Sequence, residues 1–119
     1  MSRDRRLRTS EEFRLVYAKG RRYDTRWFTV FIYPRGFANH RLGVTASSKA
    51  VGSAVERNRA KRILREIFRL SAADLDLITS KYDWVLNAKR SLLVSKAEDR
   101  AAEFKKIIQQ VVKADLSAN

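Results

Sequence analysis

The segment from Trp27 to Tyr33 constrains the fold of this 119-residue chain more than any other. Aromatic and β-branched residues dominate it, and Pro34-Arg35-Gly36 follows it, which is typical of a β-strand. Strand side chains alternate between two faces, and here both faces are apolar or aromatic. We therefore expect packed elements on both sides of the sheet. One face carries Phe28, Val30 and Ile32, and the other carries Trp27, Thr29, Phe31 and Tyr33.

Three capping boxes mark helix starts, because a Ser or Thr and a Glu three residues later satisfy each other's backbone N–H groups. They pair Thr9 with Glu12, Ser53 with Glu56 and Ser95 with Glu98. The first predicted helix spans 10–19 and stops at Gly20. The second runs from 53 to about 70, and the third closes the chain.

Two further strands are predicted, at 41–46 and at 83–88. The first of them is expected to return beside 27–33 as a hairpin, with His40 exposed in the turn. The resulting order is helix, strands, helix, strand, helix. It predicts an α+β sandwich in which helices cover a small sheet, with residues 1–119 forming a single domain.

Charge defines the class of partner. The chain has 26 Lys and Arg against 13 Asp and Glu, a net charge of +13, and most of the excess lies in the first 70 residues. Nucleic acid is the first candidate partner and an anionic membrane the second. The absence of cysteine excludes disulfide scaffolds, zinc fingers and thiol catalysis. No secretory signal and no apolar run of about 20 residues is found, so we expect a cytoplasmic protein.

The second predicted helix has an apolar side and a basic side. Glu56 and Glu66 lie at the edges of the basic stripe and leave its centre without acidic partners. Because guanidinium groups bind phosphate oxygens bidentately, we interpret the stripe as a polyanion site rather than a solvated face. A membrane-surface helix fits less well, since the apolar side must cover the sheet. A helix-turn-helix fits less well too, since strand and loop precede the helix. The apolar side comprises Ala60, Ile63, Leu64, Ile67 and Phe68, and the basic side comprises Arg57, Asn58, Lys61, Arg62, Arg65 and Arg69.

Aromatic residues of the first helix and the first strand allow two interpretations. Phe13, Tyr17 and Phe31, with Trp27 or Tyr33, either belong to the core or line a groove for single-stranded nucleic acid. The groove would have positive walls from Arg14, Lys19, Arg21, Arg22 and Arg26.

Catalytic groups are not evident in the sequence. The acidic cluster of Asp74, Asp76 and Asp83 is explained by capping and solvation, and Ser47-Ser48-Lys49 lacks any feature of an activated nucleophile. The chain is therefore predicted to be a binding protein, or the subunit of an enzyme whose chemistry lies elsewhere.

A family resemblance makes this prediction specific. Gly43-Val-Thr-Ala-Ser-Ser-Lys-Ala-Val51, followed by the segment 54–66, closely resembles the signature of the bacterial ribonuclease P protein subunit. The most specific part is Arg57-Asn58-Arg59-x-Lys61-Arg62-x-x-Arg65-Glu66. The resemblance covers roughly residues 3–110 in the family's order and spacing.

The resemblance implies a ribosomal-protein-like α+β domain of order α-β-β-β-α-β-α with a left-handed crossover. It implies a catalytic RNA partner that uses Mg²⁺ to remove the 5′ leader of precursor tRNA endonucleolytically. The protein would be a non-catalytic monomer in this ribonucleoprotein, with no membrane partner. The Mg²⁺ would be held through the RNA subunit and substrate and not by the protein alone.

Site residues follow from the same resemblance. Phe13, Tyr17 and Phe31 would contact the leader, with Lys49 as a further candidate, and no catalytic or metal-binding residue is assigned. The family often has two adjacent lysines where this chain has Ser48-Lys49. A general or ribosome-associated RNA-binding protein is the main alternative, and a stand-alone nuclease is disfavoured. The basic residues expected to bind the RNA subunit are Arg57, Asn58, Arg59, Lys61, Arg62, Arg65 and Arg69.

Overall fold

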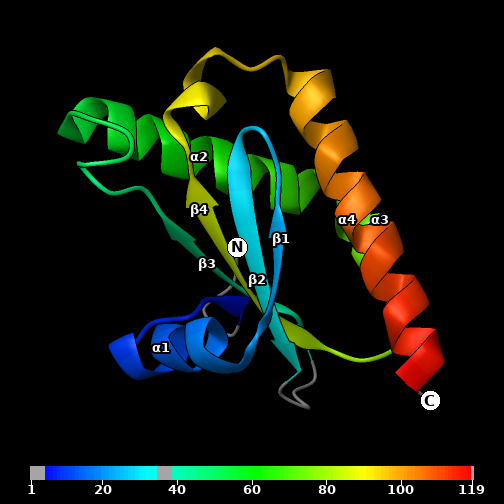
Figure 1. Cartoon of the computed structure of the whole chain (residues 1–119). Helices are drawn as coiled ribbons and strands as arrows, with labels where there is room; N and C mark the ends of the chain where they lie inside the picture. The colour runs from blue at the N-terminus through cyan, green and yellow to red at the C-terminus, as the bar shows by residue number, and fades with distance from the viewer. Residues whose placement is uncertain (1–4, 35–38, 119) are drawn as a thin grey trace.

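The structure is a computed structural model that describes residues 5–34 and 39–118. A four-stranded sheet lies between helices (Figure 1). The order α-β-β-β-α-β-α is confirmed, with α3 and η2 as short additions. The elements are α1 (Ser10–Lys19), β1 (Arg21–Asp24), β2 (Phe28–Pro34), β3 (Arg41–Thr45), α2 (Ala54–Leu70), α3 (Ala72–Leu75), β4 (Tyr82–Ala88), η2 (Arg90–Val94) and α4 (Ala97–Ala118).

The sheet has the strand order β1-β2-β4-β3. The predicted hairpin between β2 and β3 is therefore wrong: β4 lies between them, antiparallel to β2 and parallel to β3. Parallel neighbours need a long crossover, and α2 provides it. The handedness of this crossover stays a prediction. Of the turn predicted after β2, Arg35 and Gly36 lie outside the described residues.

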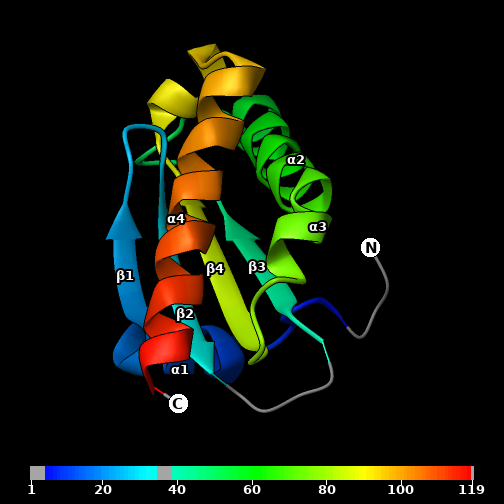
Figure 2. The same ribbon diagram turned by 90° about the vertical axis from the view of Figure 1, so that its right-hand side faces the viewer.

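Helices α2 and α4 cover one face of the sheet (Figures 1 and 2). Phe28, Val30 and Ile32 are buried there, which confirms the predicted alternation in β2. Trp84 of β4 is the centre of this core: its ring lies 5.9 Å from that of Phe68 on α2 and 5.7 Å from that of Phe104 on α4. Aromatic pairs at these distances and tilted angles add to the burial of apolar area.

Helix α1 covers the opposite face, but only at one end of the sheet (Figure 1). Leu7, Val16 and Val85 form a small buried cluster beneath it. Both faces are thus covered, as predicted from β2.

Two of the three predicted capping boxes are present. Thr9 pairs with Glu12 and Ser53 with Glu56 at the starts of α1 and α2. The third prediction is wrong, because α4 begins at Ala97 and the hydroxyl of Ser95 donates to the carbonyl of Leu92 instead. Among the helices of the described residues, none is long and apolar enough to cross a bilayer.

Gly20 ends α1 as predicted, although it does so without a left-handed backbone, since its φ is −78°. Glycine is required there for a steric reason. A Cβ would clash with the carbonyl oxygens of Val16 and Ile32.

His40 is buried, so its predicted place at the surface is wrong. Its Nδ1 accepts hydrogen bonds from the backbone N–H of Tyr82 at 3.0 Å and from the indole Nε1 of Trp84 at 3.1 Å. Its Nε2 lies 3.2 Å from the carbonyl oxygen of Leu75, which makes Nε2 the protonated nitrogen. Burial lowers the pKa of His40, and the positive charge of Lys81 acts in the same direction. The neutral ring therefore joins β4 to α3.

We expect His40→Gln to reduce the free energy of unfolding at pH 7.5 by about 1–3 kcal/mol, since buried donors lose their acceptor. The pKa of His40 is lower in the folded than in the unfolded state, so its contribution is complete above about pH 6.5 and is lost as the pH falls further. Chemical denaturation at several pH values should show the difference between the two proteins shrinking with acid. Parallel pH profiles for the two proteins would contradict this account.

Candidate nucleic-acid interface

The basic face of α2 comprises the charged and amide side chains that point away from the sheet. Its exposed members are Asn58, Arg59, Arg62, Arg65 and Arg69. The opposite side buries Ala60, Leu64, Ile67 and Phe68 against the sheet, with Ile63 partly buried beside them. Because the apolar side is fixed by burial, the helix holds the basic face toward solvent.

Two residues of the predicted basic stripe lie at its flank instead. Arg57 and Lys61 are half-buried, and the guanidinium of Arg57 lies 3.5 Å from the carbonyl oxygen of Gly52. A 100° advance per residue puts Arg57 about 60° from the buried Ala60, which explains its position. The prediction that these two side chains share the outward face is therefore wrong.

Ion pairing on α2 is concentrated at the two ends. Glu66 pairs with Arg69 at 2.8 Å, and Glu56 pairs with Arg90 at 3.1 Å, so Arg69 does not belong to the unpaired centre. Within residues 5–34 and 39–118, no carboxylate lies within salt-bridge distance of Arg59, Lys61, Arg62 or Arg65. These four cations are available to an external anion.

The N-terminal segment extends the basic face, which the sequence patterns did not reveal. Arg6 bridges to Leu42 of β3 in parallel register, and the N–H of Leu7 donates to the carbonyl of Leu42 at 3.0 Å. This pairing brings Arg6 and Arg8 to the same hollow as Arg65. No local pattern could have found it, since the contact joins segments far apart in the chain.

Three rings, those of Phe13, Tyr17 and Phe31, lie on the α1 face of the sheet, and we call this surface the aromatic groove. Of the three, Phe13 lines the hollow that also contains Arg6, Arg8 and Arg65. The rings of Tyr17 and Phe31 meet edge to face with their centroids 4.9 Å apart. Tyr17 is 39% exposed, and its hydroxyl donates to Oδ1 of Asn87 at 2.9 Å. Phe13 and Phe31 are half-buried and pack on the small cluster under α1. Phe13 and Phe31 are therefore partly core, whereas Tyr17 is exposed, and the binding of single-stranded nucleic acid to these rings stays a prediction.

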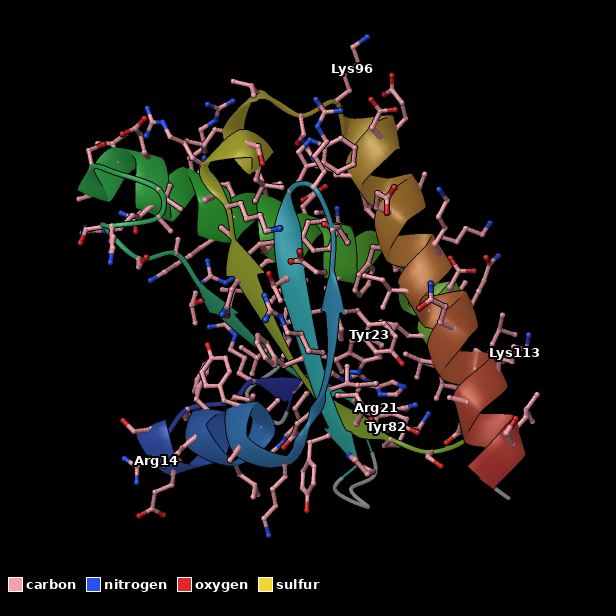
Figure 3. All side chains as sticks on the ribbon, viewed as in Figure 1. Arg14, Arg21, Tyr23, Tyr82, Lys96 and Lys113 are labelled. Atoms are coloured by element: carbon pink, nitrogen blue, oxygen red, sulfur yellow. The ribbon has the colours of Figure 1, made fainter. Side chains whose placement is uncertain are left out.

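The other aromatic and basic residues predicted for the groove lie on different faces of the sheet. Tyr33 packs on the cluster under α1 with Phe31, as predicted. Trp27 packs on the main core instead, so its predicted place on the same face as Phe31 is wrong. The guanidinium of Arg22 lies 5.9 Å from the ring centre of Phe31, so Arg22 is a wall of the groove. Arg21 pairs with Ile32 and points to the α4 side with Tyr23, as Figure 3 shows, so its predicted place in the wall is wrong.

Four predicted residues remain: three basic residues of the groove walls and the leader-binding candidate in the β3–α2 turn. Arg14 projects from the outer side of α1 in Figure 3, and Arg26 stacks on Trp27 at 5.9 Å. Lys19 is exposed at the end of α1. Lys49 is exposed in the turn between β3 and α2, outside the aromatic cluster.

Arg41 fixes α1 to the sheet. Its Nε and Nη2 donate to the two carboxylate oxygens of the buried Asp83, each at 2.8 Å, and its Nη1 donates to Glu12 at 2.8 Å. Partial burial acts to raise the pKa of Glu12. The N–H groups of Arg8 and Thr9 and the charge of Arg41 outweigh it and lower that pKa to about 2. This ion-pair network joins α1, β3 and β4 and so sets the position of Phe13 and Tyr17.

The other candidates for chemistry are accounted for by structural contacts. Asp83 is bound to Arg41 and does not gather with Asp74 and Asp76, and within the described part of the chain no three potential metal ligands cluster. The hydroxyl of Ser47 accepts from the N–H of Ala50 at 3.0 Å and stabilises the turn before α2.

The fold and its two surfaces define a small α+β protein that presents an arginine-rich helix beside an aromatic groove. The chain belongs to the ribonuclease P protein family, whose family model, described as Ribonuclease P, matches residues 1–112. It is 41% identical over 87 residues to the ribonuclease P protein component of Methylococcus capsulatus, an alignment that covers 73% of this chain and 65% of the relative. It is 38% identical over 89 residues to that of Clostridium botulinum, with 75% and 78% covered.

Solved structures agree with the family assignment. The ribonuclease P protein from Thermotoga maritima superposes with a TM-score of 0.74 at 25% identity, covering 88% of this chain and 96% of that one. The Staphylococcus aureus protein gives 0.67 at 25% identity, with 96% and 94% covered. The alignment spans about two thirds of the length of the Methylococcus relative and more of the Clostridium one.

Gly43 sets the position of Phe13. A Cβ at Gly43 would lie 2.5 Å from Cζ of Phe13, so we expect Gly43→Ala to displace the ring and to destabilise the fold by about 1–3 kcal/mol. Phe13→Leu removes the clashing atoms, so the double variant should be about as stable as Phe13→Leu alone. Thermal or chemical denaturation of the four proteins checks this, and additive losses would show that the two positions do not interact.

Proposed function

We propose that this chain is the protein subunit of ribonuclease P. The basic face of α2 would bind the catalytic RNA, and the aromatic groove would bind the single-stranded 5′ leader of precursor tRNA. One observation carries the proposal. In a chain of this family, Arg65 of the basic face and Phe13 of the aromatic groove line one hollow beside β3, together with Arg6.

The two surfaces suit two forms of RNA. Arginines on a rigid helix present fixed forks of donors to the phosphates of a folded RNA. Aromatic rings beside cations bind unpaired bases, each stacked base contributing about 1–3 kcal/mol. Binding both partners at once would hold the leader next to the catalytic RNA and raise the affinity of the holoenzyme for precursor tRNA.

In this proposal the RNA subunit catalyses the cleavage of precursor tRNA. We assign the Mg²⁺ ions to the RNA subunit and the substrate, and the part of the protein described here contains no cluster that fits a metal. The protein's own contribution is to bind and orient two RNA segments. It would act as a monomer in a cytoplasmic holoenzyme.

Reconstitution tests the proposal against a general RNA-binding role. Precursor tRNA should remain uncut by the protein with Mg²⁺ and should be cleaved once the ribonuclease P RNA is added, at lower Mg²⁺ than the RNA alone requires. A general or ribosome-associated RNA-binding protein would not lower that requirement. Cleavage by the RNA-free protein would refute the subunit assignment.

Salt dependence tests the basic face. Replacing Arg62 and Arg65 by Ala should lower the slope of log K against log salt for the ribonuclease P RNA by about 0.7–0.9 for each phosphate that the variant no longer neutralises. Lys105→Ala with Lys113→Ala removes two exposed cations of α4 and should leave the slope unchanged. Equal changes in the two double variants would mean that only net charge matters.

A comparison of precursor tRNA with mature tRNA tests whether the aromatic groove binds the leader. Phe31→Leu keeps an apolar side chain on the cluster under α1 but removes the ring, so precursor tRNA binding should weaken about tenfold while mature tRNA binding is nearly unchanged. Phe28→Leu removes a ring from the opposite face and should change neither affinity. If Phe31→Leu lost affinity for both tRNAs, the role of this residue would be structural only.

A further inference from the structure

A second hollow, the α2–α3 pocket, lies between the C-terminal half of α2, α3 and the N-terminal segment. Its volume is about 310 Å³. Figure 2 shows α2 and α3 along one side of the sheet, beside the edge formed by β3. The pocket shares Arg62, Arg65 and Arg69 with the basic face, but none of the aromatic-groove rings lines it.

The floor of the α2–α3 pocket is formed by buried side chains. Phe68, Leu75 and His40 line it, and all three are buried. Hydrogen bonds to Trp84, Tyr82 and Leu75 occupy both ring nitrogens of His40, so the imidazole offers its ring surface rather than a donor. Such a floor suits a flat, apolar group.

The rim of the pocket is strongly basic. Its cations come from three parts of the chain, which are the N-terminal segment, α2 and the residue before β4. They outnumber the carboxylates of Glu66 and Asp76. Glu66 already pairs with Arg69. The amide of Asn39 adds one neutral donor and acceptor. The cations are Arg5, Arg6, Arg62, Arg65, Arg69 and Lys81.

This combination selects the class of ligand. An inorganic anion would not need the apolar floor, and an apolar ligand would not need six cations. A nucleotide needs both, together with hydrogen-bonding groups for the edge of its base. The volume lies at the lower end of the range of about 300–1,000 Å³ for small-molecule sites, which admits one nucleotide and excludes a duplex.

We propose that the α2–α3 pocket binds one unpaired nucleotide of an RNA chain, with the base on Phe68, Leu75 and His40 and the phosphate among the rim arginines. The proposal rests on the RNA-binding role of α2 and adds recognition of a base to it. The same chemistry is available to a free nucleotide, so the experiment separates the two sources.

Trp84 provides the readout. Its indole N–H donates to His40, whose ring lines the pocket, so an occupant should shift the indole resonance in a ¹H–¹⁵N spectrum. Trp27 is the internal reference, because it lies at the other end of the paired strands β2 and β4. It directly precedes β2, whereas Tyr82, which binds His40, pairs with Pro34 at the far end of β2. The probes are adenosine 5′-monophosphate, ribose 5-phosphate, inorganic phosphate, a penta-adenylate RNA and a hexaglutamate peptide.

Ala72 and Ala73 offer a matched pair of variants, since both are exposed on α3 but only Ala72 lines the pocket. Ala72→Phe fills the pocket without changing its charge and should weaken penta-adenylate binding about tenfold, whereas Ala73→Phe should not. Adenosine 5′-monophosphate and penta-adenylate should shift Trp84 and spare Trp27, with the pentamer binding more tightly. Ribose 5-phosphate should bind more weakly than either.

Three results would overturn the proposal. Equal Trp84 shifts with phosphate or hexaglutamate would show an anion or acidic-peptide site without base recognition. Equal affinities of Ala72→Phe and Ala73→Phe would exclude the pocket. Adenosine 5′-monophosphate binding as tightly as the pentamer would indicate a free nucleotide. In the first two cases the subunit role still stands if the wild-type protein activates the ribonuclease P RNA. Failure of that activation refutes the proposed function itself.

Discussion

The bidentate ion pair between Arg41 and Asp83 is the contact on which the positions of both the basic face of α2 and the aromatic groove depend. These two residues are directly opposite in the parallel pair of β3 and β4, and their side chains lie on the face that α1 covers. A shift of one residue in this register would turn Arg41 into the apolar core and leave Asp83 as an unpaired buried charge. The pair therefore fixes the register of β3. Its third hydrogen bond, to Glu12, fixes α1 as well.

The position of β3 in turn brings the two surfaces together. Its outer edge pairs with Arg6, which brings the N-terminal arginines beside Arg65 of α2, and Gly43 leaves space for the ring of Phe13. The excess positive charge on these elements opposes compactness through self-repulsion. The aromatic core around Trp84, on the far face of the same strands, provides the compensating burial. A partner polyanion would remove the repulsion and stabilise the same arrangement.

Local features of the structure were predictable from the sequence. The boundaries of α1 and α2, the alternation in β2 and the apolar side of α2 all depend on residues within a few positions of one another. Pairing between distant segments was not predictable. The predicted hairpin failed because β2 accepts β1 and β4 as neighbours, and His40 became buried because its partners, Leu75, Tyr82 and Trp84, come later in the chain. Arg21 was misplaced because the short strand β1 was not recognised from its residues.

The sequence by itself determined the family, through the ordered motif from Gly43 to Glu66, and its charge favoured a polyanionic partner. It also determined which side of α2 is buried, since helical periodicity is a local property. Only the tertiary structure decided that Phe13 and Phe31 are half-buried while Tyr17 is exposed, and that Arg6 and Arg65 share a hollow. The reason is physical: which strands become neighbours depends on burying both faces of β4 at once, and that condition involves every element of the chain.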